Sequence, residues 1–540
     1  LPLLPRIDTM SNNPQTSSRR DFLSLSSSAV GAFLVADTLS NFNYLQASNV
    51  DKSGNKSPYG PLKPTKDMNT GLELLSLPDG FKYVTGNWAG ETMSDGRKMP
   101  GAHDGMGVIA DNKGVVTLCR NHEINGVKPS YAKAANTYDA NASGGTSNFT
   151  FDCNTGKFLT SQASLSGTVR NCAGGVTPWG SWLTCEETLL GPEEESDPKH
   201  EETHGWIFEV PADGNGSPVP LKDMGRFVHE AVAVDPVTSI VYETEDRSTS
   251  GLYRFLPKTK GKLIDGGTLQ MMKVPGQLDL SKNVKPGAVF ENIEWVTIDD
   301  PTIPHVQGTT NALGVYSQGR KLGGTNFARL EGIWHYQGSI FFDSTSGGNV
   351  SAGQIWEYIP SKNTLRLVFE SPDKLVLNMP DNLAISPRGG ILVCEDCGTT
   401  TVKTEAGIER FYPRLQMLSP EGDIFPLGFN NVIINKRTMG KKGDFRGSEW
   451  TGVNFSPDGR WLFANIQSPG FTAAITGNDV TIIGETSSNL VSWNNSTILS
   501  EISLSKDLLT KQIILRSDTP ITIGSTEQIR LRVELDKANQ

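Results

Sequence analysis

A cysteine and two glutamates stand at the two ends of one short apolar segment, NCAGGVTPWGSWLTCEET (residues 171–188). Cys172 lies before the first apolar run, and Glu186 and Glu187 follow the second. Two apolar runs separated by a Pro-Trp-Gly turn are typical of a β-hairpin. Thiolates and carboxylates both bind metals, and a thiolate indicates a metal softer than calcium, which prefers oxygen ligands. The segment therefore predicts a mixed sulfur and oxygen donor set at one end of a hairpin.

Five further segments repeat this pattern of an alternating strand, a turn rich in Pro, Gly or Asp, and a second strand that ends in polar residues. They span residues 103–123, 229–246, 330–346, 380–397 and 448–467. Repetition at uneven spacing, with short antiparallel strands and insertions between them, favours a β-propeller over a solenoid. The sequence therefore predicts an all-β fold, a six-bladed β-propeller.

The polar residues at the hairpin ends predict where a site would form. The first strands open on Asp104, Cys172, Glu230, Glu331, Asp381 and Glu449. The second strands end in Asn121, Glu123, Glu186, Glu187, Glu243, Glu245, Asp343, Glu395, Asp396 and Asn465. These two ends of a hairpin lie together, so first strands beside the axis would bring the opening residues to one mouth of the central channel. So many acids would repel one another unless cations compensate their charge.

Acids at strand ends are also common as solvated turn residues, which is the alternative for any single hairpin. Their recurrence at equivalent positions in six hairpins favours a metal site at one mouth of the channel. On this argument alone the predicted ligands, besides Cys172, are Glu123, Glu230, Asp381, Glu395 and Glu449. The same argument nominates Asn121 as a catalytic residue.

Arg329 adds a group that could bind an anion. It lies two residues before Glu331, and residues at this spacing on a strand share a face. The planar guanidinium pairs with two phosphate oxygens at once, so an arginine beside metal ligands suits a phosphorylated substrate. The alternative is a structural salt bridge to one of the acids. Metal ions and this arginine would together supply what phosphoryl transfer needs, so Arg329 is predicted as a catalytic residue.

Composition narrows the class of protein. The 540 residues carry a formal net charge of -10, which argues against a nucleic-acid or anionic-membrane partner. Six cysteines, among them Cys394 and Cys397 in a CxxC pair, do not decide whether a disulfide forms.

Three domains are expected: an N-terminal extension with a signal peptide over 1–47, a linker over 48–75, and a propeller over 76–540. Within the propeller, the structure of residues 471–540 is undecided.

The segment SRRDFLSLSSSAVGAFLVA, from Ser18 to Ala36, resembles a twin-arginine export signal, with a disordered N-terminus as the alternative. Its apolar run is too short and polar for a stable membrane span. We therefore expect recognition by the twin-arginine translocation machinery, a periplasmic or extracellular location, and a monomer.

Several longer motifs, together with the twin-arginine start, resemble the PhoX-type alkaline phosphatases from about residue 80 to residue 470. They are RNHE, NCAGGVTPWGSWLTCEE, HGWIFEV, GRFVHEAVAVDP, VYETEDR, GLYRF, ARLEGIW and FSPDGRWLFANIQSPG. The resemblance implies a six-bladed propeller that holds Fe3+ and Ca2+ and hydrolyses phosphate monoesters outside the cytoplasm. It further implies that Cys172 binds iron, that Glu187, Glu245 and Glu331 bind metal, and that Arg329 contacts phosphate.

The resulting prediction is an exported, metal-dependent alkaline phosphatase that releases inorganic phosphate from phosphate monoesters. One alternative is a calcium-dependent propeller lactonase or phosphotriesterase, which needs neither the thiolate of Cys172 nor Arg329. Another is a non-catalytic, calcium-stabilised binding propeller, which would bind metal without turning over a substrate.

Overall fold

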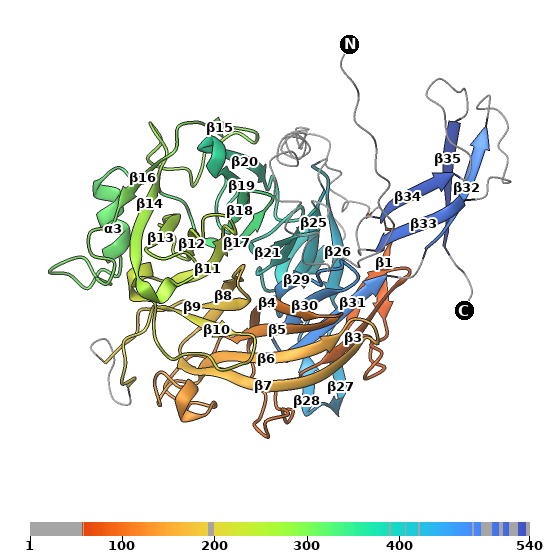
Figure 1. Cartoon of the computed structure of the whole chain (residues 1–540), viewed down its shortest axis with the longest axis horizontal. Helices are drawn as coiled ribbons and strands as arrows, with labels where there is room; N and C mark the ends of the chain where they lie inside the picture. The colour runs from red at the N-terminus through yellow and green to blue at the C-terminus, as the bar shows by residue number, and fades with distance from the viewer. Residues whose placement is uncertain are drawn as a thin grey trace, which may run out of the picture. The chain divides into compact units, whose positions relative to one another are not determined.

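Six antiparallel sheets form the blades of a β-propeller (Figure 1). The computed structural model describes residues 57–535, except 58, 193–198, 388–389, 405–406, 420–421, 478–479, 488–498, 507–510 and 518–527. The predicted export signal lies outside the described residues. The all-β fold and the six blades predicted from the repeated hairpins are confirmed.

The predicted hairpins are the inner two strands of the blades. The innermost strands are β4 (His103–Asn112), β8 (Asn171–Val176), β11 (His229–Val234), β17 (Leu330–Tyr336), β21 (Pro380–Ile385) and β29 (Trp450–Phe455). The second strands are β5 (Val115–His122), β9 (Ser181–Glu186), β12 (Val241–Glu245), β18 (Ser339–Ser344), β22 (Ile391–Glu395) and β30 (Leu462–Ile466). Each innermost strand contacts the innermost strands of the two neighbouring blades, so the six close a ring around the axis.

The outer strands complete the blades. They are β6 (Gly144–Asp152), β7 (Lys157–Thr168), β10 (Ile207–Pro211), β13 (Tyr253–Pro257), β14 (Gly267–Lys273), β16 (Glu294–Thr297), β19 (Gln354–Ile359), β20 (Thr364–Glu370), β15 (Val289–Phe290), β25 (Arg414–Leu418), β26 (Ile424–Asn430) and β31 (Phe471–Gly477). The sixth blade is closed by β3 (Phe81–Gly86), which pairs with β31. The chain thus joins its N-terminal part to its last blade, and this pairing closes the ring.

Smaller elements lie around the blades. β1 (Leu62–Thr65) and β2 (Leu75–Pro78) extend the fifth sheet through β26, so part of the expected linker is strand. Two hairpins stand apart, β23 (Thr400–Thr404) with β24 (Gly407–Phe411) and β27 (Ile433–Thr438) with β28 (Lys441–Asp444). An α-helix, α3, spans Gly314–Lys321. No helix among the described residues is long and apolar enough to cross a membrane.

The C-terminal part forms two further strand pairs. β32 (Val480–Ser487) pairs with β35 (Gln528–Leu535), and β33 (Leu499–Lys506) pairs with β34 (Lys511–Ser517). The first strand of the undecided segment, β31, belongs to the sixth blade.

The hydrophobic core lies between blades. Trp182 and Phe208 of the second blade pack with Ile109 of the first, and Leu183 of the second packs with Val232 of the third. Burying such side chains between sheets stabilises the fold by about 1.5–3 kcal/mol for each large apolar side chain. Apolar contacts therefore hold neighbouring blades together. The ends of the inner strands at one mouth of the channel are not needed for this packing, so they can carry polar groups.

A β-bulge near the start of every inner strand shapes this mouth. In all six blades the pairing of the first and second strands skips two residues, for example between His103 and Met106 and between His229 and Val232. Bulges re-aim side chains and are frequent next to active sites. Gly105 and Gly332 lie inside two of these bulges, where a Cβ would clash with Ala173 and with Asp381 of the next blade. The inner strands can approach this closely because glycine has no side chain.

Candidate metal centre

Five of the six predicted opening residues occupy the same place in their blades. Each is the second residue of an inner strand and lies within its bulge: Asp104, Cys172, Glu230, Glu331 and Asp381. All five are buried. Glu449 differs, because it lies directly before β29 and is half-buried. We call these six residues the ring.

The last residue of the second strand and the residue after it have different surroundings. Glu186, Glu245 and Glu395 each end a second strand, and each pairs with the first residue of its inner strand. Their carboxylates bind the third strand of the blade or the loop that leads to it. Glu186 accepts a hydrogen bond from the Gly205 N–H at 2.9 Å. Glu245 accepts one from the Tyr253 hydroxyl at 2.8 Å, and Glu395 pairs with Arg414 at 2.7 Å.

The next residue along each of these strands faces the ring instead. Each donates its main-chain N–H to the residue before the inner strand, and the three are Glu187, Asp246 and Asp396. Glu123, which follows β5, makes the same main-chain hydrogen bond. Successive residues of a strand point to opposite sides. The structure therefore places Glu187, Glu123, Asp246 and Asp396 beside the ring, whereas the carboxylates of Glu245 and Glu395 bind Tyr253 and Arg414.

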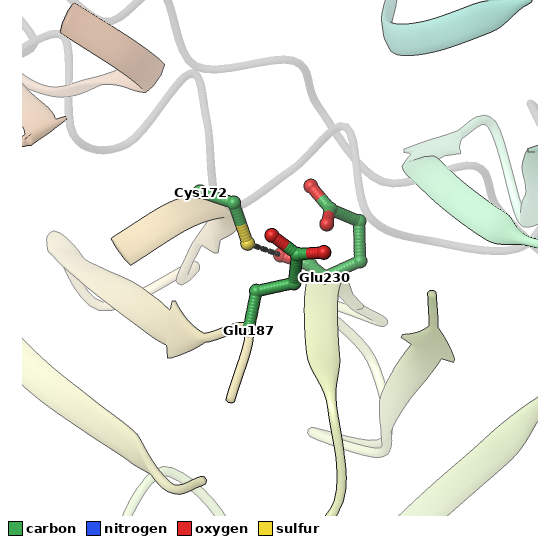
Figure 2. Close-up of side chains that lie close together, drawn as sticks. All are labelled: Cys172, Glu187 and Glu230. Carbon is green, nitrogen blue, oxygen red and sulfur yellow. Dashed lines mark hydrogen bonds between the residues drawn. The ribbon is translucent and has the colours of Figure 1, made fainter. Parts of the chain in front are cut away.

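Two groups of side chains could each hold a metal ion. Cys172, Glu187 and Glu230 bring their donor atoms within 4.8 Å of one another, and so do Asp381, Asp396 and Glu449. Figure 2 shows the first group, in which side chains from the second and third blades converge. The Cys172 thiol also faces the main-chain oxygens of His229 and Glu230, both at 3.4 Å. Because the set combines sulfur with oxygen donors, it fits iron better than calcium, which prefers oxygen ligands.

The electrostatics of the ring favour bound protons or cations over free anions. Burial, followed by repulsion from neighbouring acids, raises the pKa of Asp104, Glu230 and Glu331 well above the usual carboxyl range. Burial raises the pKa of Glu187 to about 9, and it raises that of Asp381 to about 8. A buried anion next to like charges is unstable unless an opposite charge compensates it. Metal ions would supply that charge once the protons leave.

The Cys172 thiol follows the same rule. Burial raises its pKa well above the usual thiol range, and the negative charge of Glu230 raises it further. Since the thiolate is the form that binds metals, a bound ion would have to displace this proton.

A cavity of about 430 Å³ opens beside the ring. It is lined by three arginines, Arg170, Arg247 and Arg329, by the acids Glu187 and Asp246, and by the hydroxyl residues Thr188 and Ser248. Two of the arginines are tied to the acids. Arg329 pairs with Asp246 at 2.8 Å and with Glu331, and Arg170 pairs with Glu187 at 2.7 Å and with Glu123 at 3.3 Å.

Arg170 and Arg329 occupy equivalent positions. Each lies two residues before a ring residue, Cys172 or Glu331, and each has a left-handed backbone, with φ of 51° and 50°. Arg329 therefore reaches the site from a tight turn before β17, and not from the strand itself as the spacing had suggested. The expected proximity of Arg329 and Glu331 holds in the structure. Both arginines combine a positive charge with several donors next to candidate metal ligands, which suits an oxyanion.

Asn121 is fully engaged in holding the second blade. Its side-chain NH2 donates to the main-chain oxygens of Ala173 at 2.7 Å and Cys172 at 3.2 Å. Its oxygen accepts hydrogen bonds from Trp182 and Thr184, both at 2.9 Å. The side chain is buried and faces the bulge that carries Cys172. In this arrangement Asn121 holds the main chain of the bulge that carries Cys172, and its own polar groups all have partners within the protein.

Sequence reasoning did not select Asp246, Asp396 and Arg170 as ligands or binding residues, although signals for them exist. Asp246 and Asp396 directly follow the predicted ligands Glu245 and Glu395, and successive strand residues point to opposite sides, so the pattern alone does not decide which neighbour faces the ring. Arg170 has the same spacing to Cys172 that Arg329 has to Glu331. Comparing the two hairpins would have identified it.

Fold and site together define a six-bladed propeller with candidate metal ligands and an arginine-lined cavity at its axis. The chain matches the family described as Alkaline phosphatase PhoX over residues 57–164 and 152–470. This match spans more than half of the chain, and the protein belongs to the PhoX family of alkaline phosphatases. The family resemblance and the phosphatase activity predicted from the sequence are thereby confirmed.

The chain is similar to several solved structures, and the first of them has the same fold. Pseudomonas fluorescens PhoX in complex with vanadate, a transition state analogue, is 18% identical with a TM-score of 0.56, covering 77% of this chain and 98% of that one. A gluconolactonase from Xanthomonas campestris is 11% identical with a TM-score of 0.36, covering 78% and 98%. A virginiamycin B lyase from Staphylococcus aureus is 10% identical with a TM-score of 0.35, covering 73% and 99%. Among curated protein sequences, none matches the chain.

Proposed function

We propose that this phosphatase is an exported, metal-dependent enzyme that hydrolyses phosphate monoesters and releases inorganic phosphate. The observation that carries the proposal is the meeting of buried ring acids and Cys172 with two equivalent arginines beside one cavity. Membership of the PhoX family supports it. The rival lactonase interpretation explains neither the thiol nor the arginine pair.

The donor sets fit Fe3+ and Ca2+. Cys172, Glu187 and Glu230 would hold Fe3+, since a thiolate suits iron and carboxylates suit a hard cation. The group of Asp381, Asp396 and Glu449 offers only carboxylate oxygens, so it would hold Ca2+. When bound, such ions supply Lewis-acid charge that stabilises phosphoryl transfer.

The chain's own residues bind and orient the phosphoryl group. Arg329 and Arg170 each offer a guanidinium fork to its oxygens, and preorganised donors of this kind lower the barrier as charge develops in the transition state. Asp246 and Glu331 hold the Arg329 guanidinium in place. Asn121 is a positioning residue that fixes the bulge carrying Cys172.

The cellular part of the proposal rests on the sequence. The twin-arginine segment supports export by the twin-arginine machinery to the periplasm or beyond, and a monomer is part of the same proposal. A reporter fused after the segment, tested with Arg19 and Arg20 both changed to lysine, checks the route. Unchanged export of the double variant would contradict it.

The test of the activity combines metal analysis with p-nitrophenyl phosphate hydrolysis on the full chain purified from its native compartment. We expect iron and calcium to copurify, activity to disappear on chelation, and readdition of both metals to restore it. Hydrolysis that survives complete metal removal would overturn the metal-dependent mechanism. Calcium binding without phosphate release, under conditions where iron is supplied, would favour a lactonase or a binding propeller.

A further inference from the structure

Arg247 differs from the two other arginines of the cavity. Arg170 and Arg329 are each paired with two acids, whereas no carboxylate among the described residues lies within salt-bridge distance of the Arg247 guanidinium. Its main chain is nevertheless fixed beside the site. The Arg247 N–H donates a hydrogen bond to the main-chain oxygen of Glu245 at 3.1 Å, and the main-chain oxygen of Arg247 accepts one from the Arg329 N–H at 2.8 Å. Among the described residues Arg247 is thus the one arginine of the cavity without an ion pair, although its charge lowers the pKa of the nearby Glu245 carboxyl, which burial raises.

The cavity is larger than a phosphoryl group requires. Cavities of about 300–1,000 Å³ enclose whole small-molecule ligands, and this one has about 430 Å³. The acids Glu187 and Asp246, which lie beside the candidate metal centre, pair with Arg170 and Arg329. The transferred phosphoryl group would therefore bind at this side of the cavity, between the candidate metal centre and the two arginines. Arg247 and the exposed Ser248 then line the space left for the alcohol portion of the ester.

We propose that Arg247 determines substrate specificity by binding a second anionic group on the alcohol portion of the phosphate ester. This inference rests on the phosphatase function proposed above and deepens it. The favoured substrates would be phosphate monoesters that also carry a carboxylate or a second phosphorus oxyanion. A guanidinium that makes no ion pair with a described acid gains from such a group, because no ion pair among the described residues has to be broken to bind it. Ser248 would donate a further hydrogen bond.

The test uses three synthetic esters of one size class. Phenyl phosphate has no second charge, para-carboxyphenyl phosphate adds one carboxylate, and para-phosphonophenyl phosphate adds a phosphonate whose C–P bond is not hydrolysed. We expect the wild-type enzyme to have a higher kcat/KM for both charged esters than for phenyl phosphate. A single charge-assisted hydrogen bond corresponds to a factor of about 10–100.

The substitution Arg247→Gln should remove most of this preference by raising KM for the charged esters, and Arg247→Lys should restore part of it because the charge returns without the fork. The preference should also weaken at high salt. The matched control is Arg437→Gln, which changes an exposed arginine on the β27–β28 hairpin and should leave the ratio unaltered.

The outcomes separate the two proposals. Failure of the metal-loaded wild type to hydrolyse phenyl phosphate would overturn the proposed function. Hydrolysis of phenyl phosphate with an equal ratio of charged to uncharged substrates in wild type and Arg247→Gln would overturn the role of Arg247 and leave the phosphatase function standing.

Discussion

Cys172 is the residue that distinguishes this site from a purely oxygen-lined calcium site. It lies in a bulge of the second blade with its thiol directed at Glu187 and Glu230. We expect Cys172→Ala to lower iron content and to reduce kcat by about 100-fold or more, because changing even the partners of metal ligands costs about 10–100-fold. Iron per protein chain, measured together with p-nitrophenyl phosphate turnover, checks this.

Cys153→Ala is the matched control for that experiment. Cys153 is also buried, but it packs with Phe151 and Trp461 between the first and sixth blades. The control should lose a little stability and keep its iron. If Cys172→Ala keeps full iron content and activity, the thiol is not a ligand.

At the scale of elements, the sequence predicted where the hairpins lie, but it did not predict which side chains at the ends of their second strands point toward the ring. An alternating pattern shows where a strand runs, and all six hairpins were found from it. The bulges at the start of the inner strands leave no comparable signal, yet each shifts the register of the two strands by one residue, because two inner-strand residues oppose one residue of the second strand. The choice between Glu245 and Asp246, or between Glu395 and Asp396, depends on this register and could not be made from one sequence.

The pair Glu395 and Asp396 makes that distinction measurable. Glu395 is buried and pairs with the nearly buried Arg414, so Glu395→Gln should cost about 3–5 kcal/mol of stability by leaving the cation unpaired. Its metal content should remain. Asp396→Asn should lower calcium content, and it should raise the stability of the metal-free protein because repulsion with Glu449 and Asp381 is relieved.

Urea unfolding of the metal-free variants and metal analysis of the loaded ones check both expectations. The opposite pattern, with metal lost in Glu395→Gln and stability lost in Asp396→Asn, would reverse the roles of the two residues.

At the scale of the whole molecule, the number of blades followed from local repeats, whereas the closure of the ring did not. Phe81 pairs with Gly477 and Gly86 with Thr472. The sequence around β3 carries no signal that predicts pairing with a strand so far along the chain. The closure matters to the site because Asp104 belongs to the first blade and Glu449 to the sixth. Burial raises the pKa of Asp104 most, and the charges of Glu123 and Glu449 raise it further, so ring charges interact across this junction.

The ring and the neighbouring Glu187 also make the stability of the protein depend on both pH and metal ions. Glu187 and Asp381 have pKa values of about 9 and about 8 in the folded protein, against about 4 in an unfolded chain. Between these limits the metal-free folded state binds protons that the unfolded state has lost, so its stability should fall as pH rises from about 5 to about 9. Each such proton contributes a slope of about 1.4 kcal/mol per pH unit.

Calcium should reverse this trend, because it binds the deprotonated carboxylates and competes with their protons. We therefore expect the increase in Tm on adding calcium to be larger at about pH 9 than at about pH 6, with a stabilisation of about 2.7 kcal/mol when calcium exceeds its Kd about 100-fold. Thermal unfolding of chelated and calcium-loaded protein across this range measures it. Asp381→Asn should flatten the slope of the metal-free protein by removing one titrating group. An equal calcium effect at both pH values would mean that the ring carboxylates ionise without the cation, and the electrostatic account of the site would then be wrong.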